Sequence, residues 1–371
     1  MSPAKYLVKI HLNFENQQNK KLEMGSLSNH AMVDMTFFCS PIGLGHATRD
    51  SAIVQHLKEI PIKFVTGDVA AKFLKQLEFN VEDVYIPPQF VIKNGLLQNS
   101  LRWLWKYYKY YKDCKYISSR IIKKERPQVV VSDEDFASIT VAQEQNLSSV
   151  LITDVLETRF TKGIGSIIER KMNQSMRDIM KKCDVIILPE EGIDEDNVRR
   201  VGPIVRTTNH SREELRKKFS FNKKTIVVSV GGTDAGKFLI EKTIESYIKI
   251  RDDVELVIVS GPSLKKVYRE NIRNLGFVNN LHEIIFASDL IISLGGKSTI
   301  DESKSYGTPG IFIPIKNHFE QEDNAMREGF LHEDVNKLDS LISQKLGEKR
   351  NPKSYDGAKK AAEIIKDIFL K

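Results

Sequence analysis

Short apolar runs alternate with helical segments along most of this chain, and that alternation constrains its fold more than any other feature. Runs such as residues 36–39 and 149–153 are short and continuously apolar, as expected for parallel strands that are buried on both faces. The series ends near residues 184–189 and restarts at residues 225–230. Two such series predict an α/β protein with two Rossmann-like domains that face each other across a cleft.

The boundaries follow from where the pattern pauses. A Gly-Pro pair at positions 202 and 203 is typical of a linker, so we predict an N-terminal domain over residues 35–203 and a C-terminal domain over residues 204–352. A final helix is expected over residues 353–371. Residues 1–34 lack the apolar core of a signal peptide, and we interpret them as a poorly ordered extension that reflects an upstream start codon. Loss of folding on their deletion would contradict that hypothesis.

The composition indicates a water-soluble protein of a reducing compartment. Of the 371 residues, 41% are apolar and 28% charged, and no apolar run reaches the roughly 18 residues that span a bilayer. The three cysteines, at positions 39, 114 and 183, are far apart and form no CxxC pair. This argues against a zinc ribbon or a disulfide framework and predicts a cytoplasmic protein.

One segment accounts for the whole formal net charge of +7. Residues 98–126 hold nine lysines and arginines against two acidic residues, and their apolar side chains recur at three- and four-residue steps. Trp103, Trp105, Tyr107 and Tyr110 add aromatic rings to this helical stripe. Three interpretations remain open: peripheral membrane contact, a long domain helix with a solvated basic face, and single-stranded nucleic acid binding. Because the excess charge is confined to one segment, we predict no nucleic acid partner.

The first strand runs into a glycine loop that ends in a histidine. Gly43 and Gly45 allow a sharp turn, and His46 then falls at the N-terminus of a helix. The helix dipole there is expected to lower the pKa of the imidazole, which suits a general base; a capping or packing histidine is the alternative. Arg49, one turn further on, either contacts a phosphate or lies on a solvated helix face.

Two acidic residues are candidates to support His46. The run of residues 132–135 follows a buried strand, at the edge where open α/β sheets place ligand groups. Asp133 or Asp135 could orient the imidazole and stabilise its charged form, while capping of the next helix is the competing interpretation.

The C-terminal series contains two glycine turns that lead into helices. After the strand at residues 289–293, Gly295 and Gly296 precede a helix that starts with Lys297, Ser298 and Thr299, an arrangement that suits a phosphate. An ordinary strand–turn–helix is the alternative. The other turn, at residues 231–237, nearly spells a P-loop, but Phe238 stands where the Mg²⁺-binding hydroxyl belongs.

Residues 293–325 resemble the donor-site signature of nucleotide-sugar glycosyltransferases of the GT-B fold, family 28 (MurG-like). The resemblance rests on Glu302, Gly307, Pro309, Pro314, Gln321 and Asn324 at their spacings. It implies a bound nucleoside diphosphate sugar as co-substrate, UDP-linked and with UDP-N-acetylglucosamine as an example, and no separate cofactor. It also implies that the last helix crosses back to the first domain.

The resemblance assigns donor-site roles residue by residue. It implies that Gly295 to Thr299 and the pair Gly232 and Thr233 face the diphosphate, and that Glu302 holds the ribose. Phe277 and Val278 would read the base, and Glu320 and Gln321 the sugar hydroxyls. Gly43, Gly45 and Arg49 match the N-terminal loop of these enzymes, whose histidine corresponds to His46.

The expected reaction is metal-independent sugar transfer with inversion to a lipid-linked or other glycan acceptor, at the inner face of the cell membrane. His46 would deprotonate an acceptor hydroxyl, or only orient the acceptor if that is a phosphate oxygen. The GxGHxxR pattern at residues 43–49 also fits a nucleotide-sugar hydrolase of the pseudaminic acid type. A non-catalytic nucleotide-sugar binder is the third alternative.

Overall fold

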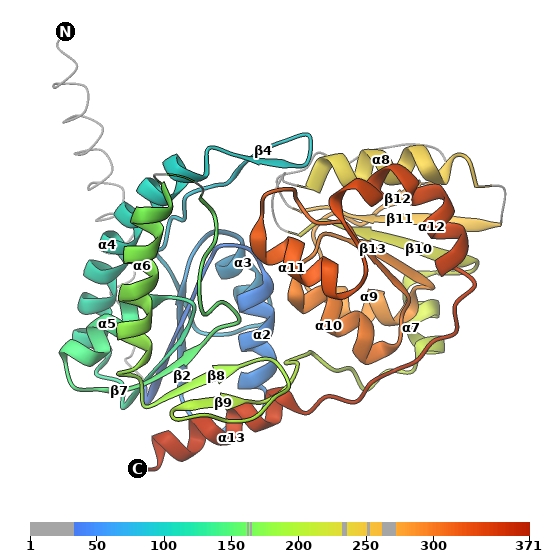
Figure 1. Ribbon diagram of the computed structural model, residues 1–371. Helices are drawn as coiled ribbons and strands as arrows, with labels where there is room; N and C mark the ends of the chain where they lie inside the picture. The colour runs from blue at the N-terminus through green and yellow to red at the C-terminus, as the bar shows by residue number, and fades with distance from the viewer. Residues whose placement is uncertain (1–32, 162, 164, 232–235, 251–252, 262–271) are drawn as a thin grey trace, which may run out of the picture.

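The computed structural model describes residues 33–161, 163, 165–231, 236–250, 253–261 and 272–371. Within these residues the chain forms two α/β domains that lie side by side (Figure 1). Each domain has its own parallel sheet with helices on its faces, as the alternating pattern predicts. Residues 1–32, on which the extension hypothesis rests, lie outside the described residues.

The N-terminal domain is built on a seven-stranded sheet in the order β3-β2-β1-β6-β7-β8-β9. Every neighbouring pair of strands in it is parallel. The strands are β1 (Met35–Cys39), β2 (Ile62–Thr66), β3 (Val81–Asp83), β6 (Val129–Asp133), β7 (Ser148–Ile152), β8 (Val185–Leu188) and β9 (Val198–Arg200). The helices of this domain are α2 (Gly45–Val54), α3 (Asp68–Gln76), α4 (Ser100–Glu125), α5 (Phe136–Glu144) and α6 (Gly165–Met180).

The C-terminal domain has a five-stranded parallel sheet in the order β12-β11-β10-β13-β14. Its strands are β10 (Lys224–Ser229), β11 (Val254–Val259), β12 (Ile272–Asn274), β13 (Leu290–Ser293) and β14 (Gly310–Phe312). Its helices are α7 (Arg212–Phe219), α8 (Lys237–Tyr247), α9 (Leu281–Ala287), α10 (Lys297–Tyr306), α11 (Phe319–Arg327) and α12 (Leu338–Lys345), with a 3₁₀ segment at His332–Lys337.

The central strands are buried on both faces, which is why their sequences are continuously apolar. All five residues of β1 are buried, and the Phe37 ring packs on Phe64 of β2 with centroids 5.3 Å apart. In the C-terminal domain, β10, β11 and β13 contribute buried residues to a separate apolar core, together with the helices around them. Two independent cores explain how two domains form from one chain.

The last helix, α13 (Gly357–Phe369), returns to the N-terminal domain and packs against α2 (Figure 1). Ala358, Ala361, Ala362 and Ile365 are buried in the same apolar cluster as Phe37 and Phe64. A segment that follows the C-terminal domain therefore completes the N-terminal core.

The connection around Gly202 is anchored to both domains. β9 immediately precedes it, and Val201 and Ile204 are buried in the N-terminal core. Arg206 is buried in turn, and its guanidinium forms an ion pair with Glu302 of α10, Nε to Oε1 2.8 Å. The sequence pattern did not indicate β9 or α7.

A hairpin that the sequence pattern also missed reaches from the N-terminal domain to the C-terminal one. It consists of β4 (Val91–Lys93) and β5 (Leu96–Gln98), which pair antiparallel. The Leu97 amide donates to the carbonyl of Lys316, and the Lys316 amide donates to the carbonyl of Gly95. Leu97 is buried in the C-terminal core, so the hairpin links the two domains along one side of the cleft.

The basic aromatic segment forms the single long helix α4, and most of its stripe faces inward. Trp103, Leu104, Cys114, Ile117 and Ile121 are buried. Leu101, Trp105, Tyr108 and Tyr116 remain exposed. Among the described helices, none is long and apolar enough to cross a bilayer.

We predict that Ile365→Ala destabilises the protein by ~2–4 kcal/mol, because it removes a fully buried side chain from the N-terminal core. Urea unfolding followed by circular dichroism measures the loss. Leu370→Ala, at a position that is 69% exposed, is the matched control and should be close to neutral. Equal losses in both variants would contradict the packing of α13 described above.

Candidate active site

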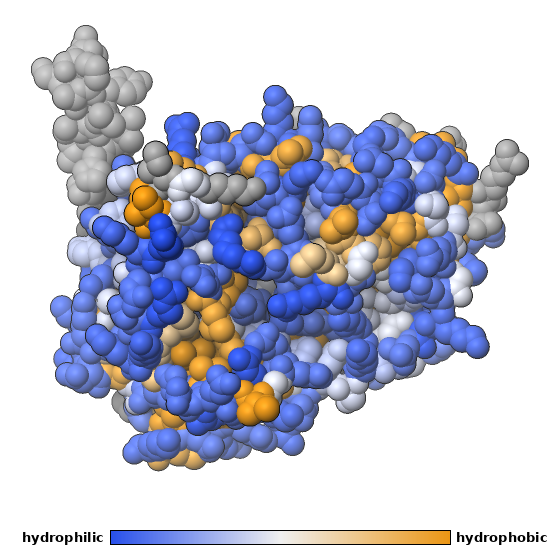
Figure 2. Space-filling model, in the orientation of Figure 1, coloured by the Kyte–Doolittle hydropathy of each residue, from blue (hydrophilic) through white to orange (hydrophobic). Residues whose placement is uncertain are grey.

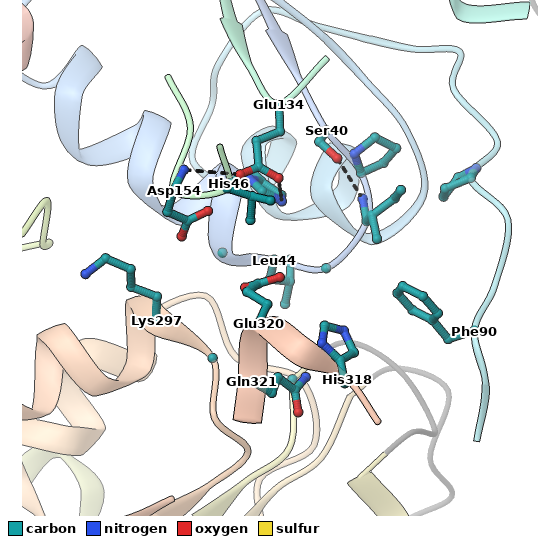
Figure 3. Close-up of a pocket in the computed structure, with 18 of the residues that line it drawn as sticks. Ser40, Leu44, His46, Phe90, Glu134, Asp154, Lys297, His318, Glu320 and Gln321 are labelled. Carbon is teal, nitrogen blue, oxygen red and sulfur yellow. Dashed lines mark hydrogen bonds and ion pairs between the residues drawn. The ribbon is translucent and has the colours of Figure 1, made fainter. Parts of the chain in front are cut away.

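A cavity of about 1150 Å³ lies between the two domains and receives side chains from both. Its N-terminal wall includes the glycine loop and His46, and its C-terminal wall includes the start of α10 and of α11. Figure 3 shows Glu320 of α11 facing Leu44 of the loop across this space. The Ser298 hydroxyl donates to the Gly45 carbonyl at 3.3 Å, so the two walls touch directly.

His46 and Asp133 meet because their strands are neighbours. β1 and β6 pair in parallel with Cys39 opposite Asp133, so the loop after β1 begins beside that aspartate. Gly43 adopts φ +90°, a conformation open to glycine, and the chain then enters α2 with His46 in its first turn. His46 Nδ1 donates to Asp133 Oδ1 at 2.8 Å. Asp133 therefore fixes the ring and leaves Nε2 as the free nitrogen.

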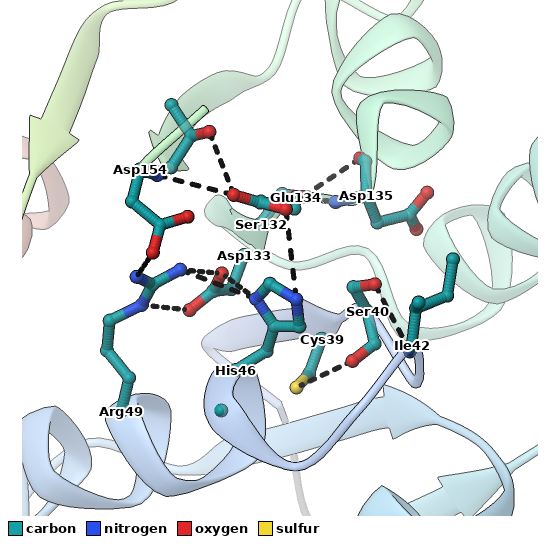
Figure 4. A network of polar contacts seen from close by, with 12 residues as sticks. Cys39, Ser40, Ile42, His46, Arg49, Ser132, Asp133, Glu134, Asp135 and Asp154 are labelled. Atoms are coloured by element: carbon teal, nitrogen blue, oxygen red, sulfur yellow. Dashed lines mark hydrogen bonds and ion pairs between the residues drawn. The ribbon is translucent and has the colours of Figure 1, made fainter. Parts of the chain in front are cut away.

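Arg49 does not lie on a solvated helix face. It is buried, and its Nε and Nη2 donate to Asp133 at 2.8 and 2.6 Å, while Nη1 lies 3.2 Å from Asp154 Oδ2 (Figure 4). Binding of donor phosphate by Arg49 stays a prediction. Its charge is already balanced by two carboxylates that the sequence pattern could not place beside it.

Asp135 does not contact His46. Its Oδ1 accepts from the Ala137 amide at the start of α5, and its Oδ2 accepts from the Tyr85 hydroxyl at 2.7 Å. Of the two candidates, Asp133 supports the imidazole and Asp135 is the helix cap, which corrects the assignment of Asp135 as catalytic.

Glu134 is a cavity residue that the sequence reasoning missed. It has φ +57°, which is uncommon outside glycine and turns its side chain into the cavity. Its Oε1 accepts from the Thr153 hydroxyl at 3.1 Å and the Asp154 amide at 3.3 Å. Its Oε2 lies 3.7 Å from His46 Nε2 (Figure 4). The available signal was its place in the acidic run that follows β6.

The pKa of His46 is raised, whereas its position at a helix N-terminus predicted that it would be lowered. Burial alone would lower the pKa of His46, but the carboxylates of Asp133 and Glu134 outweigh burial and raise it to about 10. Two nearby carboxylates act at shorter range than a helix dipole, which explains why the expected lowering is wrong.

The acidic side chains around His46 cannot all be ionised. The pKa of Glu134 is raised by burial and by the charge of Asp154, while Arg49 holds the pKa of Asp133 below its usual value despite burial. Burial and the charge of Asp154 also raise the pKa of Glu320, on the opposite wall, to about 7. The cluster therefore retains protons near neutral pH and can accept or release one there.

Three of the predicted donor residues, Gly43, Gly45 and Arg49, lie on the N-terminal wall of the cavity, and the others that are described lie on or beside its C-terminal wall. They include Gly296, Lys297, Ser298, Thr299, Glu302, Glu320, Gln321, Phe277 and Val278. Gly295 lies just outside this lining, and a Cβ on it would be 2.4 Å from the Gln321 carbonyl, so only glycine fits there. Gly232 and Thr233 lie outside the described residues.

The start of α10 can receive an anion. No side chain caps this helix at Gly296, so the amides of its first turn have no partner within the helix. A Cβ on Gly296 would meet nothing within 4 Å. Lys297 is held by Asp301, Nζ to Oδ2 2.6 Å, at the cavity edge. In the described part of the chain, no group of three or more histidine, cysteine or acidic residues could hold a metal ion.

Glu302 faces the cavity while it is paired with Arg206. A carboxylate offers about four lone-pair sites, so the ion pair leaves capacity for hydroxyl groups. Gln321 Oε1 accepts from the Ile315 amide, which leaves its NH₂ group available. The roles of these residues in sugar binding stay predictions.

Comparison with known proteins defines the class. Residues 225–363 match the glycosyltransferase family 28 C-terminal domain. An uncharacterized glycosyltransferase of Methanopyrus kandleri is 27% identical over 56% of this chain and 62% of its own length. An uncharacterized glycosyltransferase of Methanosarcina acetivorans is 25% identical over 78% of this chain and 82% of its own length. The Carboxydothermus hydrogenoformans UDP-N-acetylglucosamine–N-acetylmuramyl-(pentapeptide) pyrophosphoryl-undecaprenol N-acetylglucosamine transferase is 27% identical over 55% and 57%.

Solved structures agree on the fold. The glycotransferase of kitacinnamycin has a TM-score of 0.60 at 13% identity and covers 90% of this chain and 98% of its own. MurG of Acinetobacter baumannii has a TM-score of 0.55 at 11% identity, over 90% and 99%. Residues 225–363 form a family 28 C-terminal domain and the chain as a whole has the GT-B fold, which confirms the predicted fold class and the family resemblance.

The pKa of His46 gives a prediction for stability. Its value of about 10 in the folded protein exceeds ~6.5 in an unfolded chain, so the folded state holds an extra proton between these values. The resulting stabilisation is complete below pH 6.5 and is lost as pH rises through 10. Urea titrations at each pH give the free energy of unfolding of the wild type and of His46→Gln. The difference between the two should be largest at pH 6 and smallest at pH 10. A pH-independent difference would contradict the raised pKa.

Proposed function

We propose that this protein transfers a sugar from a nucleoside diphosphate sugar, UDP-linked, to a hydroxyl group of a lipid-linked or other glycan acceptor, with inversion. One observation carries this proposal: the His46–Asp133 pair and the uncapped start of α10 face the same cavity from opposite domains. A base on one wall and an anion site on the other are what a displacement at an anomeric carbon requires.

The donor would bind on the C-terminal wall. The start of α10 receives the diphosphate, Glu302 the ribose, Phe277 and Val278 the base, and Glu320 and Gln321 the sugar hydroxyls. The Carboxydothermus hydrogenoformans relative is named for UDP-N-acetylglucosamine, which supports this donor as the first to test.

The reaction would proceed without a metal ion. When His46 is neutral, the acceptor oxygen attacks the anomeric carbon, its proton passes to His46 Nε2, and the bond from that carbon to the diphosphate breaks. The departing diphosphate gains negative charge at the start of α10, where free amides and the helix dipole stabilise it. Residues 232–233 are expected to add a second such contact.

An apolar extension of the cavity favours a lipid-linked acceptor. Beyond His46 the cavity continues between α4 and α6, where its lining includes Leu104, Trp105, Ile168, Met172 and Met176. We call these five residues the α4–α6 groove. Figure 2 shows apolar surface in a hollow of the N-terminal domain, on the side of α6 that faces α2. A sugar or a nucleotide does not need such a lining, whereas a hydrocarbon chain does.

The same region is the candidate membrane contact, over residues 98–126. Trp105 and Tyr108 are exposed near the mouth of the groove, and Arg102, Lys106, Lys109 and Lys112 lie on the same helix. Aromatic rings and cations in this combination suit the headgroup region of an anionic membrane. This arrangement supports an enzyme that works at the cytoplasmic face of the membrane.

Nucleotide release from a panel of UDP-, GDP- and dTDP-sugars, with and without native membrane lipids, tests the proposal. We expect release that depends on lipid and falls at least ~10²-fold in His46→Ala, because the base is lost. Donor affinity, measured by calorimetry, should be unchanged in that variant. Rapid release without any acceptor would instead indicate the hydrolase, and binding without release would indicate a nucleotide-sugar binder.

A second prediction concerns the groove. Ile168→Ser should raise KM for a long-chain lipid acceptor ~10-fold, because the groove loses apolar contact area, and should leave a short-chain analogue unaffected. Steady-state kinetics with the two acceptors measures the difference. Tyr116→Ser is the control, because Tyr116 is 64% exposed on α4 and lies outside the cavity lining. Equal effects on both acceptors would argue against the groove as the chain-binding site.

Glu302→Gln should weaken binding of the nucleoside diphosphate ~10-fold, because hydrogen bonds from hydroxyls to a carboxylate are stronger than those to an amide. Calorimetric titration with UDP measures this, with the exposed Glu157→Gln as a control for removal of an acidic charge. Unchanged affinity would show that the carboxylate only balances Arg206.

A further inference from the structure

Glu134 is placed to touch the acceptor group that reacts, and it belongs to none of the sequence motifs described above. His46 Nδ1 is occupied by Asp133, so any proton taken from an acceptor must go to Nε2. The Glu134 Oε2 atom is 3.7 Å from Nε2, too far for a direct hydrogen bond. One hydroxyl oxygen can, however, lie within about 2.8 Å of both atoms at once.

The carboxylate is held in this position from two sides. Its other oxygen accepts from the Thr153 hydroxyl and from the Asp154 amide. The left-handed backbone at Glu134 separates three consecutive acidic side chains, since Asp133 turns to His46 and Arg49 while Asp135 turns to Tyr85. A strained backbone conformation of this kind persists only where surrounding structure enforces it.

We infer that Glu134 and His46 act together as a two-atom notch that binds the acceptor hydroxyl, and that the two residues share one proton. This inference rests on the proposed function and deepens it by naming a second residue that contacts the acceptor. The notch would be competent when the shared proton is absent. The hydroxyl proton then passes to Nε2, the oxygen–carbon bond forms, and the electron pair of the breaking bond leaves with the diphosphate.

Titratable groups from several elements lie around this notch. Asp133 ends β6 and Glu134 follows it, Arg49 is on α2, Asp154 follows β7, Tyr107 is on α4, and Glu320 projects from α11 of the other domain. Only Arg49 is cationic among them, and it is committed to Asp133 and Asp154. Removal of the Glu134 charge should therefore make it easier for His46 to lose its proton.

The test is Glu134→Gln, assayed by turnover across pH 6–11.5 and by NMR titration of histidine-labelled protein. We expect the acid limb of kcat to move at least one pH unit lower, with a plateau about 10-fold below wild type from the lost contact. The His46 resonance, assigned among the eight histidines by comparison with His46→Gln, should titrate at correspondingly lower pH. Glu157→Gln, an exposed acid of the same domain, should change neither profile.

Failure of this inference is distinguishable from failure of the proposed function. The NMR titration needs no turnover, so it tests the shared proton even if transfer activity is absent. An unmoved His46 titration in Glu134→Gln would overturn the inference. So would a loss of kcat with an unmoved acid limb, because that is the signature of structural damage. Glu134→Asp keeps the negative charge, and aspartate tolerates the left-handed backbone. We expect its acid limb to lie closer to that of the wild type than the acid limb of Glu134→Gln does. Identical acid limbs in the two variants would show that the charge is irrelevant.

Discussion

The buried carboxylate of Asp133 is the interaction on which the N-terminal half of the site depends. It is fully excluded from solvent and accepts hydrogen bonds from His46 and from two guanidinium nitrogens of Arg49. A buried carboxylate is costly unless its partners are also held in place. Because both partners lie on α2, this pairing fixes the start of that helix against β6, and with it the direction of the His46 ring.

The second constraint is that each wall of the cavity belongs to a different domain. The site therefore exists only if the two domains keep their relative position. Several contacts maintain it. The hairpin of β4 and β5 pairs with Lys316, the Ser298 hydroxyl reaches Gly45, and α13 completes the N-terminal core after the chain has left the C-terminal domain. Arg206 adds a link at the connection, since its guanidinium lies over the Phe73 ring of α3 while it pairs with Glu302.

Local sequence patterns predicted what local physics decides. Continuous apolar runs identified the central strands, and the glycine turns identified where each series delivers polar groups to the sheet edge, including His46 and the start of α10. Interactions between distant segments were out of reach. The spacing of Arg49 from His46 suggested one helix face, but the carboxylates that bury it arrive from β6 and β7. The pKa of His46 and the direction of Glu134 depend on the same tertiary placement, and the hairpin carries too few residues to show a period.

The two walls differ in electrostatic character, and this difference bears on which acceptor the cavity can take. Asp133, Glu134 and Asp154 gather around His46, with Glu320 opposite them, and Arg49 is already paired. A neutral hydroxyl can donate a hydrogen bond to the carboxylates here, whereas an ionised phosphate oxygen can only accept one. The anion-binding features lie instead at the start of α10, on the side where the diphosphate is expected to leave. The arrangement therefore favours a hydroxyl nucleophile over the phosphate oxygen that the sequence left open.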